Sequence, residues 1–286
     1  MTLHALSTRE CIELMSREDS RVIESLNQAA DALACFVEKL IPRFERGGRL
    51  IYLGAGTSGR LGVLDASEAP PTFQLAPNRI VGIIAGGDRS LRQSSEGLED
   101  DPNGAFTQLH DLDLAADDTL LGIAAGGTTP FVLGSFSIAK SHAPACLTGF
   151  LTCTPIATPC DVDQLIVLDT GPEILTGSTR LKAGTATKLA LNTISTTLMV
   201  RTGRVYENLM VDLRASNDKL RDRAGRIVMA LTNLDRAAAF DLLDRAQGSV
   251  KIAVLMHRCR LDAQQAHAYL EACNGRLDKA LEHEAE

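Results

Sequence analysis

Residues 49–59 of the chain read RLIYLGAGTSG. The apolar run Arg49–Gly54 has the composition of a strand that is buried on both faces, and the glycine-rich segment after it opens a helical stretch. Further apolar runs repeat this rhythm through the middle of the chain, at Arg79–Ala85, Thr119–Ala125, Ala145–Thr152 and Gln164–Asp169. Helical stretches between such runs imply βαβ crossovers and a parallel sheet. We therefore expect a doubly wound α/β domain over residues of about 45–200.

Helical sequence flanks this region on both sides. Ser7 to Glu10 is a capping-box pattern, which predicts a helical N-terminal segment that runs with breaks to about residue 46. After Lys182, apolar residues recur at spacings of three and four residues, which predicts a long buried helix that ends at Gly203. We expect three parts: a helical segment over residues 1–45 that packs on the core, the α/β domain over residues 46–223, and a small helical domain over residues 224–286.

The composition argues against several function classes. The chain has 36 acidic and 29 basic residues, a formal charge of −7 and no basic stripe, so nucleic acid and membrane surfaces are not expected partners. It has no Trp and only 4% aromatic residues, so it lacks the aromatic side chains on which the bases of single-stranded nucleic acid or sugar rings usually stack. No signal sequence or long apolar stretch is visible, and we expect a cytoplasmic protein. Seven cysteines without a C-x-x-C pair and six histidines without ligand spacing predict reduced thiols and no metal site.

The GAGTSG motif that begins at Gly54 fits G-x-G-x-x-G, which suggests a dinucleotide fold. That fold also needs an acidic residue about 20 positions further on, but Asp88, which follows the second run, comes more than thirty positions later. Thr57 and Ser58 instead place hydroxyls beside N–H groups at a helix start, which suits a terminal phosphate. A second hydroxyl-bearing loop, Gly126–Pro130, would meet the first at the carboxyl edge of the sheet. The pattern favours a phosphosugar pocket, and tight turns without a ligand are the alternative.

Acidic side chains near such a pocket would allow paired acid and base chemistry. Glu68 precedes two prolines at residues 70–71, which are expected to end the helix and hold Glu68 on a rigid turn. Glu96 is expected to share a helix face with Glu99 or Asp100. From the residues alone, Glu99 fits a solvated surface charge better than a base.

Residues 178–182 read STRLK, with two hydroxyls and two cations just ahead of the long helix. They suit contact with a carboxylate or phosphate of a substrate. They suit equally well an ordinary helix N-cap with solvated bases, and the sequence leaves both interpretations open.

Several long blocks carry a resemblance to a known family. They are GRLIYLGAGTSGRLGVLDASEAPPTF (Gly48–Phe73), EGLEDD (Glu96–Asp101), EILTGSTRLKAGTATKLALNTIS (Glu173–Ser195) and NLMVDLRASNDKL (Asn208–Leu220). In this order they closely resemble the N-acetylmuramic acid 6-phosphate etherases, over nearly the whole chain. The resemblance implies a sugar isomerase domain with a five-stranded parallel sheet, a C-terminal three-helix domain of the ubiquitin-associated type, and a homodimer with its sites near the subunit interface.

The resemblance also implies an activity, which is cleavage of the D-lactyl ether at carbon 3 of N-acetylmuramic acid 6-phosphate during recycling of cell-wall sugars. The products would be N-acetylglucosamine 6-phosphate and D-lactate. It places the acid on Glu68 and the base on Glu99, against the surface role that the residues alone favour for Glu99, and it implies no metal and no cofactor. The residues expected to bind the phosphosugar are Gly56, Thr57, Ser58, Gly59, Ser67, Thr128, Thr129, Ser178 and Lys182.

The second loop departs from the common family pattern. Gly126 stands where many members have Ser, and Thr128 stands where a basic or polar residue is frequent. Two other functions remain open: a phosphosugar sensor without catalysis, similar to the glucokinase regulatory proteins, and an aldose–ketose phosphate isomerase with a single base. The presence of both Glu68 and Glu99 favours the etherase over the sensor, and the DASE-x-PP block favours it over plain isomerases.

Overall fold

The computed structural model describes residues 2–93, 96–213 and 218–282. Its contacts divide the chain into two compact units. Unit 1 comprises Met1–Glu68 and Pro77–Ser195, and unit 2 comprises Ala69–Ala76 and Thr196–Glu286. The boundary that we expected between residues 223 and 224 falls inside a helix of unit 2, α7 (Asp218–Thr232).

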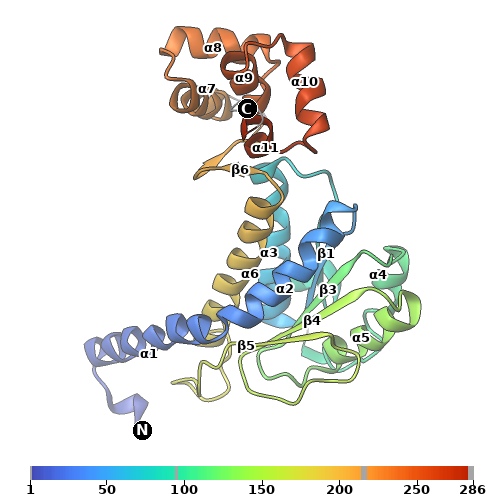
Figure 1. Ribbon diagram of the computed structural model, residues 1–286. Helices are drawn as coiled ribbons and strands as arrows, with labels where there is room; N and C mark the ends of the chain where they lie inside the picture. Colours follow the sequence, from blue (N-terminus) through green and yellow to red (C-terminus); the bar gives the residue numbers. More distant parts are fainter. Residues whose placement is uncertain (1, 94–95, 214–217, 283–286) are drawn as a thin grey trace. The chain divides into compact units, whose positions relative to one another are not determined.

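Unit 1 is built around a parallel sheet of five strands in the order β2-β1-β3-β4-β5 (Figure 1). The strands are β1 (Leu50–Gly54), β2 (Ile80–Ile84), β3 (Thr119–Ile123), β4 (Leu147–Thr152) and β5 (Gln164–Val167). Each strand lies within one of the five apolar runs, so the expected α/β fold is confirmed. Every residue of β1, β3 and β4 is buried, as expected for strands that helices cover on both faces.

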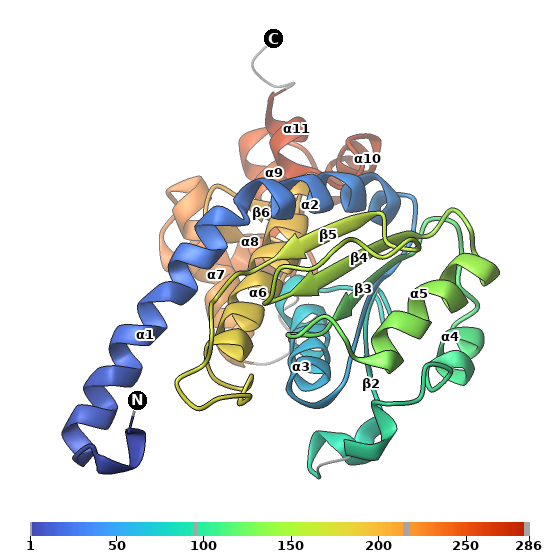
Figure 2. The ribbon, with the colours of Figure 1, turned by 90° about the horizontal axis from the view of Figure 1, so that it is seen from below.

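Helices cover both faces of this sheet (Figure 2). One face carries α4 (Phe106–Asp111) and α5 (Pro130–His142), and the other carries α2 (Ala30–Glu45), α3 (Gly56–Phe73) and α6 (Lys182–Arg201). Glycines in the strands allow the helices to approach closely. A Cβ on Gly122 would lie 2.4 Å from the Phe136 ring of α5, and a Cβ on Gly149 would lie 2.5 Å from the Phe36 ring of α2.

The N-terminal segment is helical, as predicted. The 3-10 helix η1 (Leu3–Ala5) is followed by α1 (Thr8–Gln28). The predicted capping box is present: the Ser7 hydroxyl accepts a hydrogen bond from the Glu10 N–H, and the Glu10 carboxylate accepts one of 2.7 Å from the Ser7 N–H. Two further 3-10 helices, η2 (Gly87–Leu91) and η3 (Glu96–Leu98), follow β2.

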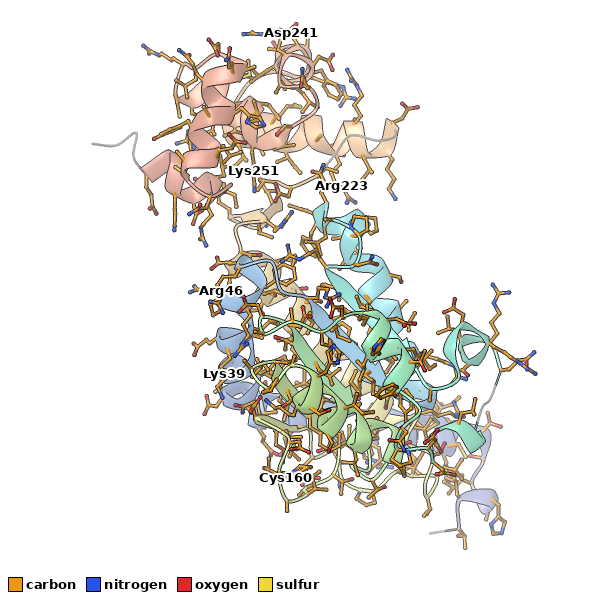
Figure 3. The ribbon with its side chains drawn as sticks, turned by 90° about the vertical axis from the view of Figure 1, so that its right-hand side faces the viewer. Lys39, Arg46, Cys160, Arg223, Asp241 and Lys251 are labelled. Atoms are coloured by element: carbon orange, nitrogen blue, oxygen red, sulfur yellow. The ribbon has the colours of Figure 1, made fainter. Side chains whose placement is uncertain are left out.

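Unit 2 is mainly helical. Besides α7 it holds α8 (Arg236–Arg245), α9 (Val250–Arg258), α10 (Ala263–Ala272), α11 (Leu277–Glu282) and a ribbon of β6 (Val205–Tyr206) and β7 (Leu209–Met210). Its apolar cluster surrounds α9, whose Lys251 is buried and donates hydrogen bonds to Asp212 (2.8 Å) and to the carbonyl oxygen of Gly275 (2.7 Å) (Figure 3). The resemblance implied three helices in residues 224–286, whereas the described part of that range holds four complete helices and most of α7.

Within the part of the chain that the structure describes, no helix has the length and apolar character needed to cross a membrane. The same residues contain no group of three or more His, Cys, Asp or Glu side chains that could hold a metal ion. All seven cysteines are free thiols.

Candidate active site

The first predicted phosphate loop joins β1 to α3. Gly59 sits so close to the strand that a Cβ there would lie 2.6 Å from the Gly54 carbonyl oxygen and 2.7 Å from Ile84. Gly56 has a φ of +51°, a left-handed conformation that favours glycine. This turn leaves Thr57 and Ser58 half-buried in the first turn of α3, where the backbone N–H groups of a helix can bind an anion.

The second predicted loop joins β3 to α5 at the same edge of the sheet. Gly127 has a φ of +72°, and Thr129 occupies the N-cap position of α5 without a capping hydrogen bond from its side chain. Thr128 is exposed. Both loops therefore present hydroxyls at the carboxyl ends of neighbouring parallel strands, as the sequence predicted.

Glu99 lies next to this second loop. Its carbonyl oxygen accepts a 3.0 Å hydrogen bond from the N–H of Phe131 in the first turn of α5, and its side chain is half-buried. The expected helix face with Glu96 is wrong, because the helix there is only the 3-10 turn η3, which ends at Leu98. The side chain of Glu96 lies outside the described part of the chain.

Glu68 lies on a helix and not on a rigid turn, which corrects the sequence-based expectation. Helix α3 runs through both prolines to Phe73. The fixed φ of proline is itself helical, and near the end of a helix the lost N–H donors affect only the last hydrogen bonds. The Glu68 side chain is 61% exposed, and one carboxylate oxygen lies 3.7 Å from the Lys188 ammonium on α6. Ser67 is exposed, and its hydroxyl donates to the Leu64 carbonyl oxygen.

Behind Glu68, a buried polar network connects α3 to β1 and α6. The carboxylate of Asp65 accepts hydrogen bonds from Tyr52 of β1 (3.0 Å) and from Ser195 of α6 (3.2 Å). Burial raises the pKa of Asp65, and hydrogen bonds from Tyr52 and Ser195 partly offset that effect. The network fixes the rotation of α3 about its axis, and it thereby fixes the face on which Glu68 lies.

The two carboxylates are far apart within one chain. Helix α3 runs back along the sheet from the carboxyl edge, because it connects two parallel strands. Glu68 follows Gly56 by 12 residues, which at 1.5 Å per residue corresponds to about 18 Å along the helix. Glu99 stays at the carboxyl edge, near the start of α5 on the opposite face of the sheet. Within the chain, Glu68 therefore lies well away from the first phosphate loop, which is at the other end of α3.

A cavity of about 180 Å³ opens at the carboxyl edge of the sheet. Its lining is rich in hydroxyls, from Thr154, Thr170, Thr176 and Thr179, of which only Thr179, in the STRLK segment, was a candidate from the sequence. Cys153 also lines it, but burial raises the pKa of this thiol to about 11, which keeps it protonated at neutral pH. The sequence signals for this cavity were its position after β4 and β5 and the hydroxyl of Thr179.

The interpretation of residues 178–182 as an ordinary helix N-cap is wrong, whereas contact of this segment with a substrate stays a prediction. Helix α6 begins at Lys182, and its first N–H groups, those of Lys182 and Ala183, donate to the Glu173 carboxylate at 3.1 and 2.9 Å. The cap is therefore Glu173 and not Ser178 or Thr179. The Lys182 ammonium is buried and bonds to Glu18 of α1 at 2.7 Å.

A larger cavity of about 390 Å³ lies in unit 2, among α9, α10 and their connecting turns. Apolar side chains such as Leu213, Ile252 and Leu270 form much of its lining. It contains neither hydroxyl loop and neither predicted catalytic carboxylate, so size alone does not make it the active site.

Comparison with known proteins agrees with the fold of unit 1. A family model described as the glucokinase regulatory protein N-terminal SIS domain matches residues 32–140. Among solved structures, a candidate phosphosugar isomerase involved in capsule formation from Bacteroides fragilis gives a TM-score of 0.51 at 21% identity, over 71% of this chain and 95% of that one. A phosphoheptose isomerase from Neisseria gonorrhoeae gives a TM-score of 0.50 at 15% identity, over 68% of this chain and 100% of that one. At these identities the likeness shows the fold alone.

Sequence relatives are much more similar. The N-acetylmuramic acid 6-phosphate etherase of Synechococcus sp. (strain CC9605) is 50% identical over 98% of this chain and 88% of its own length. The etherase of Gloeobacter violaceus is 49% identical over 98% of this chain and 91% of its own length. The etherase of Halalkalibacterium halodurans is 45% identical over 98% of this chain and 94% of its own length. With such identity over nearly the full length, the chain belongs to the family of the N-acetylmuramic acid 6-phosphate etherases.

Proposed function

We propose that this protein is a carbon–oxygen lyase that cleaves the D-lactyl ether of N-acetylmuramic acid 6-phosphate in recycling of cell-wall sugars. The observation that carries this proposal is the near-50% identity to etherases over 98% of the chain. The site agrees with it, because two hydroxyl-bearing loops suit a phosphate and two carboxylates, Glu68 and Glu99, suit acid and base chemistry.

The reaction is an elimination followed by an addition. In the open-chain sugar, the proton on carbon 2 is acidic because it lies next to the aldehyde. Glu99 takes this proton as the bond between carbon 3 and the ether oxygen breaks, and Glu68 protonates the departing oxygen to give D-lactate. A water molecule then adds to carbon 3 of the double bond, Glu68 accepts its proton, and Glu99 returns a proton to carbon 2. The substrate's own carbonyl stabilises the developing charge, so the residues present suffice for the chemistry.

The phosphate would be held by the hydroxyls of Thr57 and Ser58 and by those of Thr128 and Thr129. Backbone N–H groups at the start of the 18-residue helix α3 add to this binding, since the positive end of the helix dipole favours an anion. Gly56 and Gly59 give the first loop its shape.

We propose further that the working form is a homodimer in which Glu68 of one protomer acts at the phosphate loops of the second copy. Three observations support this arrangement: the rise of about 18 Å between Gly56 and Glu68 along α3, the exposure of Glu68, and the exposed apolar side chains of α1. Those of α1 are Ile12, Met15 and Ile23, and such a surface on a helix is typical of an interface with another chain.

A second candidate is a phosphosugar sensor without catalysis, which the match of residues 32–140 to a glucokinase regulatory protein domain favours. The experiment is a coupled D-lactate assay with N-acetylmuramic acid 6-phosphate, on the wild type and on Glu99→Gln. The etherase predicts lactate release that falls by about a thousandfold in the variant. The sensor predicts no lactate from either protein, with a melting temperature that the sugar phosphate still raises.

A further inference from the structure

Lys182 is the first residue of α6, and its side chain is only 2% exposed. A buried ammonium needs partners that replace water. Lys182 Nζ donates to the Glu18 carboxylate on α1 at 2.7 Å and to the Pro172 carbonyl oxygen at 2.8 Å. The hydrogen bond from Lys182 lowers the pKa of Glu18, in accord with an ion pair. A residue from the N-terminal helix therefore binds the start of a helix that lies 164 residues further along the chain.

The same residue closes a loop. The Glu173 carboxylate accepts hydrogen bonds from the backbone N–H groups of Lys182 and Ala183, while the Lys182 side chain donates back to the carbonyl oxygen of Pro172. The two ends of the segment 172–182 are thus joined by hydrogen bonds between the side chain of each end and the backbone of the other. Inside it, hydrogen bonds from the N–H of Ser178 to Leu175 O and from that of Leu181 to Ser178 O hold the turns.

This segment forms a large part of the cavity at the carboxyl edge. Among the residues that line the cavity, Pro172, Glu173, Thr176, Gly177 and Thr179 come from it. Lys182 itself is not among the lining residues. Its ammonium already binds Glu18 and the Pro172 carbonyl oxygen, so it is badly placed to bind a substrate phosphate.

We propose that Glu18 and Lys182 act as a pair of positioning residues, which hold the segment 172–182 in the shape that forms the threonine-lined part of the substrate site. The proposal rests on the proposed etherase function. It assigns a role to α1: the N-terminal helix shapes the sugar pocket through one ion pair, in which Lys182 is buried and Glu18 is half-buried. It also changes the role of Lys182 from substrate contact to support of the loop.

The test uses the full chain with Glu18→Gln, Lys182→Met and the double variant. Glu18→Gln leaves a buried ammonium without its counter-charge, which lowers the melting temperature. The double variant removes that unpaired charge, so part of the melting temperature returns. All three variants lose the ion pair that joins the end of the segment to α1, so we expect KM for N-acetylmuramic acid 6-phosphate to rise about tenfold in each, with kcat within about twofold.

The control is Asp117→Asn, which removes an exposed ion pair between Asp117 and Arg46 (2.6 Å) at the amino edge of the sheet. Asp117 lies just before β3, at the amino ends of the strands, whereas Cys153, Thr154 and Thr170 of the cavity lie after the carboxyl ends of β4 and β5, so the pair is remote from the cavity. We expect wild-type KM for this control variant.

A readout that does not depend on activity is hydrogen exchange in the protein without ligand. We expect the N–H groups of Lys182 and Ala183 to exchange faster in the three variants and at the wild-type rate in Asp117→Asn. Unchanged exchange would overturn the proposal whatever the enzyme does. A KM that recovers together with the melting temperature in the double variant would also overturn it, because the pair would then be structural only. Loss of lactate release in the wild type would instead refute the proposed function.

Discussion

The hydroxyl of Tyr52 on β1 donates a 3.0 Å hydrogen bond to the carboxylate of Asp65 on α3. Both side chains are buried, and Ser195 of α6 donates to the other carboxylate oxygen at 3.2 Å. Asp65 precedes Glu68 by one turn of the same helix, so this contact inside the unit sets the direction in which the proposed acid faces.

Tyr52→Phe removes the phenolic hydroxyl and leaves a buried carboxylate with one partner fewer. We expect a loss of about 1–2 kcal/mol in the free energy of unfolding, because an unsatisfied buried acceptor loses its hydrogen bond without regaining water. Urea unfolding of the variant measures this loss. A variant as stable as the wild type would show that the Tyr52 hydroxyl contributes nothing to the packing of α3.

Asp118 at the start of β3 predicts a pH dependence of stability. Burial acts to raise its pKa, but hydrogen bonds from the Arg49 guanidinium and from the backbone N–H groups of Ala115 and Arg49 outweigh this effect and leave the pKa lowered. The group therefore stabilises the fold above its unfolded pKa of about 3.9, and this contribution disappears as the pH falls through the lowered folded pKa.

Asp118→Asn should accordingly lower stability at pH 7 by about 3 kcal/mol, since it leaves the largely buried Arg49 without its charged partner. Below the folded pKa of Asp118 the difference from the wild type should shrink. Denaturant unfolding at neutral and acidic pH measures both quantities. An equal difference at all pH values would contradict the assignment.

Substitution of two glycines in the phosphate loops, Gly59 and Gly126, should have opposite effects on the protein. Gly59→Ala places a Cβ 2.6 Å from the Gly54 carbonyl oxygen, and we expect it to lower stability by about 1–3 kcal/mol. At Gly126 a Cβ would meet nothing closer than the Thr128 hydroxyl at 3.8 Å. Gly126→Ser should therefore fold normally and, with one more hydroxyl in the loop, lower KM for the phosphosugar severalfold. Thermal melts and KM values of the two variants check this contrast.

The shared site predicts complementation between two inactive variants. Glu68→Gln and Glu99→Gln should each be inactive alone. When they are unfolded together and refolded at equal amounts, half of the dimers are mixed, and one site in each of those has both carboxylates. Activity should return to about a quarter of the wild-type value. No return of activity, with mixed dimers demonstrated by mass spectrometry, would place both carboxylates in one chain.

Much of the fold could be predicted because its signals are local. The five strands follow from continuous apolar runs, and the capping box of Ser7 and Glu10 marks the start of α1. The hydroxyl loops lie where parallel strands end. The prediction around Glu68 was wrong because the rule that proline ends a helix applies to the helix interior, whereas only two residues of α3 follow its prolines.

The rest of the site depends on contacts that are distant in sequence. Lys182 finds Glu18 across 164 residues, and no local pattern indicates this pair. Glu173 caps a helix that begins nine residues later, where the rules for capping look only at the residue just before the helix. The distance between Glu68 and Glu99 follows from the path of α3 behind the sheet, which the resemblance to a family does not show.

The most direct measurement follows the oxygen atoms of the reaction. N-acetylmuramic acid 6-phosphate is incubated with the wild-type protein in water enriched in oxygen-18, and both products are examined by mass spectrometry. Elimination followed by addition predicts that the label enters N-acetylglucosamine 6-phosphate at carbon 3 and is absent from the hydroxyl of D-lactate, and that Glu99→Gln forms neither product. Label in the lactate hydroxyl, or no lactate at all, would contradict the account.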